Sequence, residues 1–445
     1  MKYNARKVAA EILNSIEKDN AFSNIEINKN VKELDTRDQN FVRELVYGVL
    51  ENKIYIDNII KNFSKTKINK IDNIILQILR VSIYQIYFIK NIPNSAICNE
   101  AVKITKMVGR NRLSGFVNGI LRNISRSQHK DFLPDKNEDL PNYLSVKYSH
   151  PKWIVNSHIK DYGKEFTEDL LKFNNEKPPL TIRVNTLKID REGLIGKLKE
   201  YNIETIKTKY SNDGLIVLKP KNITELEEFK EGLFTIQDES SQLVARIMNP
   251  KSGSKVLDVC SAPGGKATHI AQIMKNKGNI ISRDIFDHKL KLIQDNAKRL
   301  GIDIIKLEKY DALELDENLA HTMDYCLVDA PCSGLGLLRR KPDIRWNKNE
   351  EDIKSLSNIQ FKILEKASKY LKKDGILIYS TCTISKDENI NVINEFLKNN
   401  DKYKLEKIDN VNIDDNSTLD KGYIELFPNI HGTDGFFIAK LKRIR

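Results

Sequence analysis

Cysteine and histidine are scarce in this sequence, and their arrangement excludes two common ways of stabilising a fold. The 445 residues include only 5 cysteines, an odd number without the spacing of a disulfide framework. We therefore expect reduced thiols and a reducing compartment. The 7 histidines never pair with cysteines at the spacing of metal ligands, so the sequence predicts no metal site.

Long apolar runs are also absent. The most apolar stretch, residues 74–89, is interrupted by Gln77, Arg80 and Gln85 and is shorter than the roughly 18–20 residues of a membrane span. We expect a buried core helix there. The amino-terminal segment carries charges within its apolar part, unlike a signal peptide. The sequence thus predicts a cytoplasmic protein without a membrane partner, and we expect it to be a monomer.

The chain does have an excess of positive charge. Hydrophobic residues make up 40% and charged residues 30%, which are the proportions of a globular protein. The formal net charge of +12 and the pI of about 9.1 favour a polyanionic partner such as nucleic acid. The sequence is also rich in Lys, Asn and Ile, a bias that AT-rich coding can produce without any binding role. Charge alone therefore leaves the partner open.

Four regions with different patterns follow each other along the chain. Residues 1–128 contain no proline before Pro93 and repeat apolar residues at helical spacing, which predicts an all-α bundle. Residues 129–150 are polar, contain two prolines and predict a linker. Residues 151–232 combine helices with short alternating strands, which predicts a small α+β module similar to an RNA recognition motif. Residues 233–445 form the last region.

This last region alternates strands with helices. The alternation predicts a mainly parallel sheet with helices on both faces, which is a Rossmann-like α/β domain. The chain is expected to close with an antiparallel edge strand over residues 435–442. The other predicted strands cover residues 255–259, 279–284, 304–311, 323–329 and 375–379.

Two of these strands end in groups that are capable of chemistry. One apolar run ends at the motif DAPCSG, residues 329–334, and another ends at STCT, residues 380–383. Because open α/β sheets bind ligands at the carboxyl ends of their strands, we expect Cys332 and Cys382 to face one crevice. A cluster of cations suited to RNA phosphates follows the first motif: Arg339, Arg340, Lys341 and Arg345.

The first strand of the α/β region ends in a turn that contains two glycines and precedes a helix. Such a turn lets a ligand approach the backbone, and the helix start offers N–H groups. The dinucleotide motif GxGxxG is absent, but acidic residues follow at three later strand ends, as in a nucleoside pocket. The candidate cofactor-binding residues are Cys260, Ser261, Ala262, Pro263, Gly264, Gly265, Lys266, Asp284, Asp311 and Asp329.

Together, the motifs CSAPGGK (residues 260–266), DAPCSG and STCT resemble those of the RNA cytosine-C5 methyltransferases. The segments RDQNFVRELVYGVL (residues 37–50) and VNGILR (residues 117–122) resemble the antitermination factor NusB and the NusB-like domain of rRNA methyltransferases. The chain as a whole thus resembles the RsmB/Sun family. This resemblance implies binding of S-adenosylmethionine and methylation of 16S rRNA, at cytosine 967 as in the family. The rRNA partner would be free or part of an early small-subunit assembly particle.

Carried over by motif, the resemblance implies that Cys382 is the nucleophile and that Cys332 assists product release. Cytosine C5 attacks a methyl group poorly, and addition of a thiolate to C6 turns the ring into an enamine that attacks well. Lys266 is the nearest candidate cation to lower the pKa of the thiol. Asp329 would either donate a proton to N3 or, as a carboxylate, accept a hydrogen bond from the N4 amino group.

Other functions remain possible on these residues. A tRNA or DNA cytosine-C5 methyltransferase would use a similar pocket, and the DNA enzymes use the cysteine of the Pro-Cys motif, here Cys332, as the nucleophile. A non-catalytic RNA-binding assembly factor would bind RNA without the cofactor. The second cysteine, Cys382, and the NusB-like start favour an RNA methyltransferase.

Overall fold

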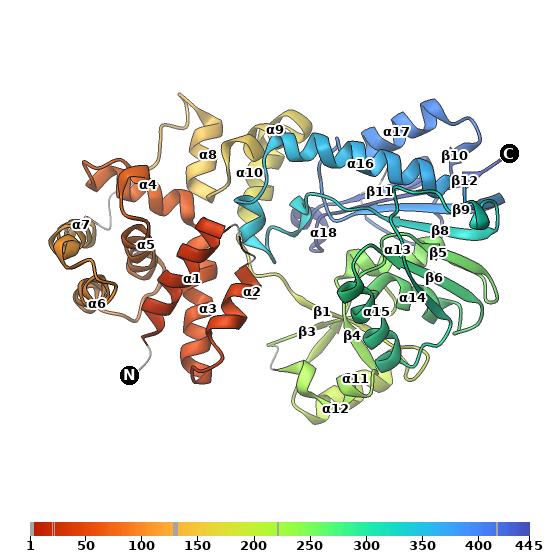
Figure 1. The fold of residues 1–445 in the computed structure, drawn as a ribbon, viewed down its shortest axis with the longest axis horizontal. Coiled ribbons are helices and arrows are strands. Elements are labelled where there is room, and N and C mark those ends of the chain that lie inside the picture. Colours follow the sequence, from red (N-terminus) through yellow and green to blue (C-terminus); the bar gives the residue numbers. More distant parts are fainter. Residues whose placement is uncertain (1–3, 20, 22, 128–131, 220–221, 415–416) are drawn as a thin grey trace. The chain divides into compact units, whose positions relative to one another are not determined.

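The computed structural model describes residues 4–19, 21, 23–127, 132–219, 222–414 and 417–445. It divides into two compact units, which can be followed by colour along the chain in Figure 1. The first unit comprises Met1–Asn175 and Lys341–Asn347, and the second comprises Glu176–Arg340 and Lys348–Arg445. The short segment Lys341–Asn347 therefore packs with the first unit, although the residues on both sides of it in the sequence belong to the second unit.

The first unit is a bundle of helices around an apolar core (Figure 1). Its most buried helix is α5, in which every residue from Ile75 to Ile86 is buried, and this confirms the predicted core helix. Asp35 and Asp72 begin α3 and α5 by accepting hydrogen bonds from backbone N–H groups of the first turns. The helices are α1 Ala5–Asp19, α2 Ser23–Asn30, α3 Thr36–Glu51, α4 Lys53–Phe63, α5 Asn73–Phe88, α6 Asn94–Met107, α7 Ser114–Arg126, α8 Leu140–Tyr148, α9 Lys152–Tyr162 and α10 Lys164–Phe173.

The predicted linker over residues 129–150 contains a helix in its second half. Residues 129–131 lie outside the described part of the chain, and α8 then occupies Leu140–Tyr148. Its start is built from residues that resemble a loop in sequence: Asp139 accepts a hydrogen bond from the backbone N–H of Asn142, and a proline lies in the first turn, where its missing N–H group does no harm. Helices α9 and α10 also pack in the first unit rather than in the small module.

The second unit begins with a small antiparallel sheet in the strand order β2-β3-β1-β4. The predicted module ends at residue 232, yet the next strand, β4, completes this sheet by pairing with β1. Residues Phe234–Ile236 were expected to open the last domain, so this boundary was wrong. The elements are β1 Leu180–Val184, α11 Arg191–Glu200, β2 Thr205–Lys207, β3 Gly214–Val217, α12 Glu227–Lys230 and β4 Phe234–Ile236.

The large sheet of the second unit has the strand order β10-β12-β9-β8-β5-β6-β7, and β11 also pairs with β12. The strands from β9 to β7 pair in parallel, as predicted. The closing strand is antiparallel, as predicted, but it is not an edge strand, because β10 and β11 pair with it. The strands are β5 Lys255–Asp258, β6 Asn279–Asp284, β7 Ile305–Lys309, β8 Met323–Asp329, β9 Leu371–Thr381, β10 Tyr403–Leu405, β11 Tyr423–Leu426 and β12 Phe436–Arg443.

Helices cover both faces of the large sheet, which confirms the predicted α/β architecture (Figure 1). Apolar residues of α13, α14 and α15 pack in one core with Val256 and Leu327, and those of α16 and α17 pack in the other core with Leu257 and Val328. Neighbouring strand residues point to opposite faces, so each strand serves both cores. The helices are α13 Glu239–Met248, α14 Gly265–Ile273, α15 Asp287–Leu300, α16 Glu350–Ser368, α17 Ile390–Asn399 and α18 Pro428–His431.

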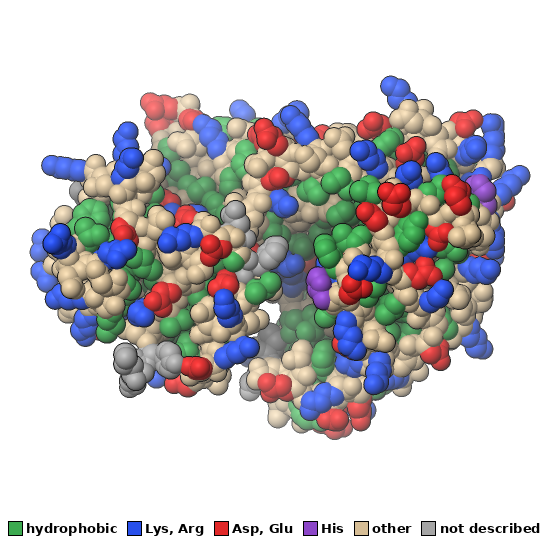
Figure 2. Space-filling view, in the orientation of Figure 1, with side chains coloured by type: hydrophobic (Ala, Val, Ile, Leu, Met, Phe, Trp, Pro, Cys, Tyr) green, Lys and Arg blue, Asp and Glu red, His purple; other side chains and the backbone are tan. Residues whose placement is uncertain are grey.

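Charge is spread over the surface of both units. On the faces visible in Figure 2, Lys and Arg side chains lie among Asp and Glu side chains rather than in one continuous patch. Within the described ranges, none of the helices has the combined length and apolar character that crossing a membrane requires. The net charge alone therefore does not identify a binding surface.

Candidate active site

The carboxyl ends of the parallel strands open into a pocket of about 410 Å³ in the second unit. Three acidic residues line it, each at or just beyond the end of a different strand: Asp284 is the last residue of β6, Asp311 follows β7 and Asp329 is the last residue of β8. Cys332 and Cys382 line the same pocket, so the expectation that both cysteines face one crevice is confirmed. The register of the sheet explains this, since Asp329 pairs with Ser380 and the two cysteines follow shortly after each.

The turn between β5 and α14 has a shape that requires glycine. Gly264 has a φ of +93°, and a Cβ atom there would lie 3.0 Å from Cγ2 of Ile293. Its N–H group donates a hydrogen bond of 2.7 Å to the carbonyl of Ser261. Cys260 and Ala262 line the pocket, while Gly265 and Lys266 form the first residues of α14. The predicted cofactor loop thus borders the pocket along one side.

Asp284 and Asp311 each hold the turn that follows their strand. Asp284 accepts a hydrogen bond of 3.2 Å from the backbone N–H of Phe286, and Asp311 accepts one of 2.9 Å from the backbone N–H of Leu313. In each carboxylate, this backbone hydrogen bond engages only one oxygen atom. Because a carboxylate offers about four lone-pair sites, both residues retain acceptor capacity toward a ligand in the pocket.

Lys266, Asp329 and Ser380 form a hydrogen-bonded group beside the cysteines. Lys266 Nζ lies 2.6 Å from Oδ2 of Asp329, and Ser380 Oγ donates a hydrogen bond of 2.9 Å to Oδ1. Burial lowers the pKa of Lys266, but the neighbouring Asp329 carboxylate more than compensates, and the net pKa is raised. Lys266 is therefore charged at neutral pH. Each oxygen of the Asp329 side chain thus has one donor.

Asp258 is an acidic residue of this region that sequence reasoning missed. Its side chain is fully buried at the end of β5, and neither carboxylate oxygen has a hydrogen-bond partner among the described residues. Burial, and then the charge of Asp329, raise the pKa of Asp258 to about 7. An aspartate within the apolar stretch VLDV was the available signal, since buried carboxyl groups are rare without a partner.

The sulfur atoms of Cys332 and Cys382 lie 3.3 Å apart. Two backbone hydrogen bonds hold their loops together: the N–H of Ala330 donates to the carbonyl of Ser380 at 2.9 Å, and the N–H of Gly336 donates to the carbonyl of Cys382 at 3.0 Å. The hydrogen bond between the thiols, followed by burial, raises the pKa of Cys332 well above its usual value. Cys332 is therefore a thiol at neutral pH, in a position to donate to Cys382.

Arg183 reaches the cofactor loop from the small sheet, and sequence reasoning also missed it. From β1 it donates hydrogen bonds to the carbonyl of Gly265 at 2.7 Å, to the hydroxyl of Thr268 at 3.1 Å and to the side-chain carbonyl of Gln237. Burial lowers its pKa to about 9. An arginine inside the strand LTIRV was the signal, because a buried cation needs acceptors from elsewhere in the fold.

Three of the four cations that were predicted to contact RNA make internal contacts instead. Arg339 donates to the carbonyls of Gly432 and Thr433, and Arg340 pairs with the carboxylates of Asp434 and Asp238. Arg345 is fully buried in the first unit, whereas Lys341 keeps an exposed side chain. The sequence could not show this, because the acceptors lie far away along the chain. A shared basic surface formed by all four residues is therefore not supported.

Arg345 ties several ends of the helical bundle together. Its guanidinium donates hydrogen bonds of 2.8–3.2 Å to the carbonyls of Glu51, Ser149 and Asn174 and to the side-chain oxygen of Asn175. Burial lowers its pKa to about 10. The residue thus acts as a structural link between the ends of α3, α8 and α10.

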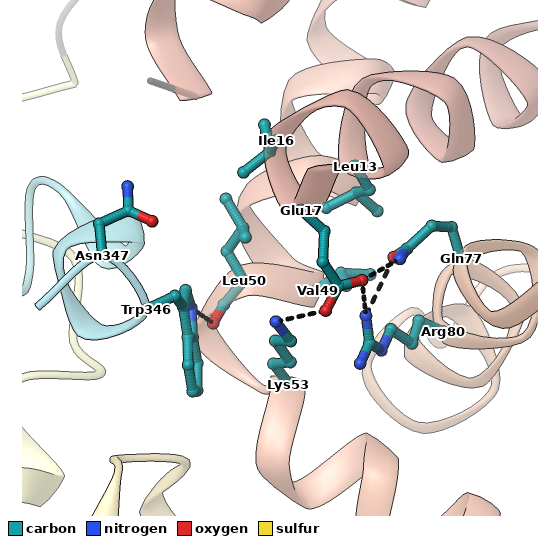
Figure 3. Close-up of a pocket in the computed structure, with 10 residues that line it drawn as sticks. All are labelled: Leu13, Ile16, Glu17, Val49, Leu50, Lys53, Gln77, Arg80, Trp346 and Asn347. Carbon is teal, nitrogen blue, oxygen red and sulfur yellow. Dashed lines mark hydrogen bonds and ion pairs between the residues drawn. The ribbon is translucent and has the colours of Figure 1, made fainter. Parts of the chain in front are cut away.

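The residue that follows Arg345 borders a small pocket of about 130 Å³ in the same unit (Figure 3). Trp346 donates a hydrogen bond of 3.0 Å to the carbonyl of Leu50, and Lys53 Nζ lies 5.1 Å from the centre of its ring. Across the pocket, Glu17 pairs with Lys53 and Arg80. Burial raises the pKa of Glu17, but these two cations outweigh it and hold the pKa at about 2. The charged groups of this pocket are thus paired with each other.

Replacing Arg345 by alanine is expected to destabilise the first unit rather than to weaken RNA binding alone. The change leaves several buried carbonyl groups without a donor, and we expect a loss on the order of 3 kcal/mol in the free energy of unfolding. Urea unfolding followed by circular dichroism measures this loss. The control is Lys341→Ala, an exposed position where a change of less than about 0.5 kcal/mol is expected. Unchanged stability in Arg345→Ala would contradict the structural role.

Three segments of the chain match known families. Residues 245–442 match the 16S rRNA methyltransferase RsmB/F, and residues 3–126 match the NusB family. Residues 150–224 match the ferredoxin-like domain described as Methyltr_RsmF/B-like. The matches confirm the predicted order of a NusB-like bundle, a small α+β module and a methyltransferase domain.

Two curated proteins are similar along the whole chain. The probable ribosomal RNA small subunit methyltransferase B of Bacillus subtilis is 39% identical over 449 residues, covering 99% of each chain. The ribosomal RNA small subunit methyltransferase B of Photorhabdus laumondii is 31% identical over 443 residues, again covering 99% of each. The similarity thus includes all the regions distinguished above.

Solved structures agree with this. The crystal structure of PH0851 has a TM-score of 0.83 at 27% identity and covers 100% of both chains. The crystal structure of NSun6 from Pyrococcus horikoshii with SFG has a TM-score of 0.60 at 28% identity, covering 66% of this chain and 98% of that one. The likeness therefore extends from the sequence to the fold.

Proposed function

Because the chain belongs to the RsmB/Sun family of small-subunit rRNA methyltransferases, we propose that it transfers a methyl group from S-adenosylmethionine to C5 of a cytosine in 16S rRNA. Cytosine 967 is the proposed position. The observation that supports this function best is the 3.3 Å contact between the sulfur atoms of Cys332 and Cys382 at the strand-end pocket. One thiol can attack the base while the second assists its release.

The pocket fits S-adenosylmethionine in size and in chemistry. Its volume of about 410 Å³ lies within the range of small-molecule sites. Asp284 and Asp311 offer acceptors for ribose hydroxyl groups, and Gly264 leaves the loop backbone open to close approach. NSun6, whose fold is similar, was crystallised with SFG, an analogue of S-adenosylmethionine. When bound, the cofactor supplies a methyl group on a sulfonium centre.

In the proposed mechanism, Cys382 adds as a thiolate to C6 of the cytosine. The C–S bond forms at C6, and the electron pair of the C5–C6 double bond becomes available at C5 for the methyl group. The positive charge of Lys266 interacts with Cys382 and favours the thiolate. The Asp329 carboxylate, which already accepts from Lys266 and Ser380, has capacity left to accept from the N4 amino group. That contact would favour cytosine over uracil.

Cys332 serves the release step in this proposal. After methyl transfer, C5 carries both the methyl group and its original proton. Removal of that proton restores the C5–C6 double bond and expels Cys382 as a thiolate. Because the pKa of Cys332 is raised, it enters this step as a thiol. It passes its own proton to the departing sulfur of Cys382, 3.3 Å away, and takes the proton from C5 in its place, directly or through a water molecule, so both cysteines end as thiols.

The function can be tested on RNA from cells and on the purified protein. Base-resolution mapping of 5-methylcytosine in 16S rRNA, from cells with and without this gene, is expected to show one position that loses its methyl group. Transfer of labelled methyl groups by the purified protein, to free 16S rRNA and to small-subunit particles in parallel, identifies the form of the substrate. Unchanged rRNA methylation together with transfer to tRNA or DNA would contradict the proposal.

Replacing Asp284 by alanine is expected to weaken S-adenosylmethionine binding about 10- to 100-fold. The change removes a charged acceptor for the ribose, and hydrogen bonds to charged groups are worth roughly 1.5–3 kcal/mol. Isothermal titration with S-adenosylmethionine measures the affinity without RNA. The control is Asp287→Asn, an exposed acid three residues later that forms an ion pair with Lys309. If both variants bind S-adenosylmethionine with equal affinity, Asp284 does not contact the cofactor.

A further inference from the structure

A buried carboxylate joins the two loops that carry Cys332 and Cys382. The Glu388 side chain is fully buried. Its Oε1 accepts hydrogen bonds from the backbone N–H of Ser333 at 2.7 Å and from Nε2 of Gln360 at 3.1 Å. Its Oε2 accepts from the hydroxyls of Ser333 at 2.5 Å and Thr383 at 3.2 Å. Each carboxylate oxygen thus has two donors. Burial raises the pKa of Glu388, and the hydrogen bonds from Ser333, Gln360 and Thr383 act in the opposite direction.

The donors are the direct chain neighbours of the cysteines. Ser333 follows Cys332, and Thr383 follows Cys382. Their hydroxyl oxygens also lie 2.9 Å apart, so the two loops and the carboxylate form one closed group. Any shift of one loop relative to the other would have to break at least one of these bonds. The group therefore restrains the relative position of the two cysteines.

The surroundings of Glu388 hold it in place. The hydroxyl of Tyr379, on β9, donates a hydrogen bond of 2.6 Å to its backbone carbonyl. Gln360, on α16, also donates to the carbonyl of Pro331 at 2.9 Å and so reaches the residue before Cys332. The amide of Asn389 donates to the carbonyl of Thr383 at 2.9 Å. A strand, a helix and both loops thus meet at this carboxylate.

We propose that Glu388 is a positioning residue that fixes the separation of the two thiols. The proposal rests on the proposed function, in which one thiol attacks C6 while the other acts near C5 of the same base. Such a reaction depends on placement, since a displacement of about 1 Å can slow a step about 100-fold. Glu388 itself has no part in bond making, because its lone pairs are occupied within the protein.

The charge of Glu388 is consistent with Cys382 as the nucleophile and Cys332 as the group that assists release. The hydrogen bond with Cys382 and burial are the largest causes of the raised pKa of Cys332. The charge of the Glu388 carboxylate raises this pKa further. Lys266 supplies the opposite charge within the group that contains Asp329. Glu388 thus helps to keep Cys332 protonated while Cys382 reacts.

Oxidation by diamide tests the separation without any methyl transfer. Diamide takes two electrons and two protons from a pair of thiols, which become a disulfide, while its N=N bond is reduced to a hydrazine. Mass spectrometry of the full chain follows the Cys332–Cys382 disulfide over time. We expect Glu388→Ala to form it at least about tenfold more slowly than the natural protein, since the thiols lose their preset proximity.

Three further variants make this measurement specific. Glu388→Gln retains an acceptor for Ser333 and Gln360 and is expected to oxidise within about twofold of the natural rate. Thr383→Val removes the hydroxyl that donates to Glu388 from the loop of Cys382, with little change in side-chain shape. We expect slower oxidation in this variant too. The control, Asp387→Asn, changes an exposed acid one residue away and should leave the rate unchanged.

Methyl transfer by the same variants gives the second measurement. Glu388→Ala is expected to lower kcat about 100-fold while the KM for S-adenosylmethionine stays within about threefold, and Glu388→Gln should recover most of the loss. If Glu388→Ala fails to fold by circular dichroism, the milder Thr383→Val decides. If the folded Glu388→Ala or Thr383→Val variant oxidises at the rate of the natural protein and has the same kcat, the proposal is overturned. A natural protein that oxidises as expected but never methylates rRNA would refute the proposed function alone.

Discussion

Replacement of Cys382 by alanine is expected to abolish methyl transfer to RNA, a loss on the order of 10⁴-fold or more. The thiolate is the only group that activates C5 in the proposed mechanism, and no other described side chain of the pocket offers an equivalent nucleophile at its position. Binding of S-adenosylmethionine should persist, because the acids at the strand ends are unchanged. Transfer of labelled methyl groups to 16S rRNA and titration with the cofactor measure the two properties separately.

The control for this experiment is a cysteine of the helical unit. Cys98 is 3% exposed in the core of the helical unit, and Cys98→Ala should retain transfer at some loss of stability. Full activity in Cys382→Ala would show that Cys382 is not the nucleophile. If activity and the covalent intermediate instead depended on Cys332 alone, the order of roles found in DNA cytosine methyltransferases would apply.

Replacement of Cys332 by alanine is expected to trap a covalent protein–RNA adduct. Cys382 can still add to C6 and the methyl group can still transfer, but release slows because the group that assists proton removal is gone. General acid–base assistance contributes about 100- to 10⁴-fold, so turnover should fall by a factor in this range. A band of reduced mobility in a denaturing gel, sensitive to ribonuclease and dependent on S-adenosylmethionine, would identify the adduct.

A double variant and a second variant test this assignment. Cys332→Ala combined with Cys382→Ala should give no band, because the nucleophile is missing. Cys332→Ser restores a polar group of similar size, and its hydroxyl should be a poorer proton acceptor than the thiolate. Rapid turnover without an adduct in Cys332→Ala would remove the release role. Tight RNA binding without cofactor affinity in the natural protein would instead favour a non-catalytic assembly factor.

The parts of the site that the sequence predicted well depend on local chemistry. Strand ends at Asp284 and Asp329 follow from apolar runs that break at a polar residue, and sheet connectivity brings such ends together. The turn at Gly264 needs a left-handed conformation that only glycine adopts easily, so its sequence indicates its shape. The convergence of Cys332 and Cys382 could be predicted because each lies just after a strand of one parallel pair.

The failed predictions concern residues whose partners lie far away in the chain. The cations Arg339, Arg340 and Arg345 resemble a phosphate-binding cluster in sequence, yet their acceptors come from elements more than 90 residues distant. The helix within the predicted linker was missed because a short helix that begins with Asp139 and a proline has the composition of a loop. The two strands that pair with the outer side of the closing strand were missed because they are only three and four residues long.

The sequence by itself determined which kind of fold forms and which residues carry the chemistry, since helical and strand periodicity, glycine turns and reactive side chains are local properties. Only the tertiary structure decided what surrounds those residues: the Glu388 carboxylate behind the thiols, the Arg183 guanidinium beneath the cofactor loop and the return of Lys341–Asn347 to the helical unit. The physical reason is that a buried charge is stable only when specific partners converge on it, and that convergence depends on chain segments that no local pattern links.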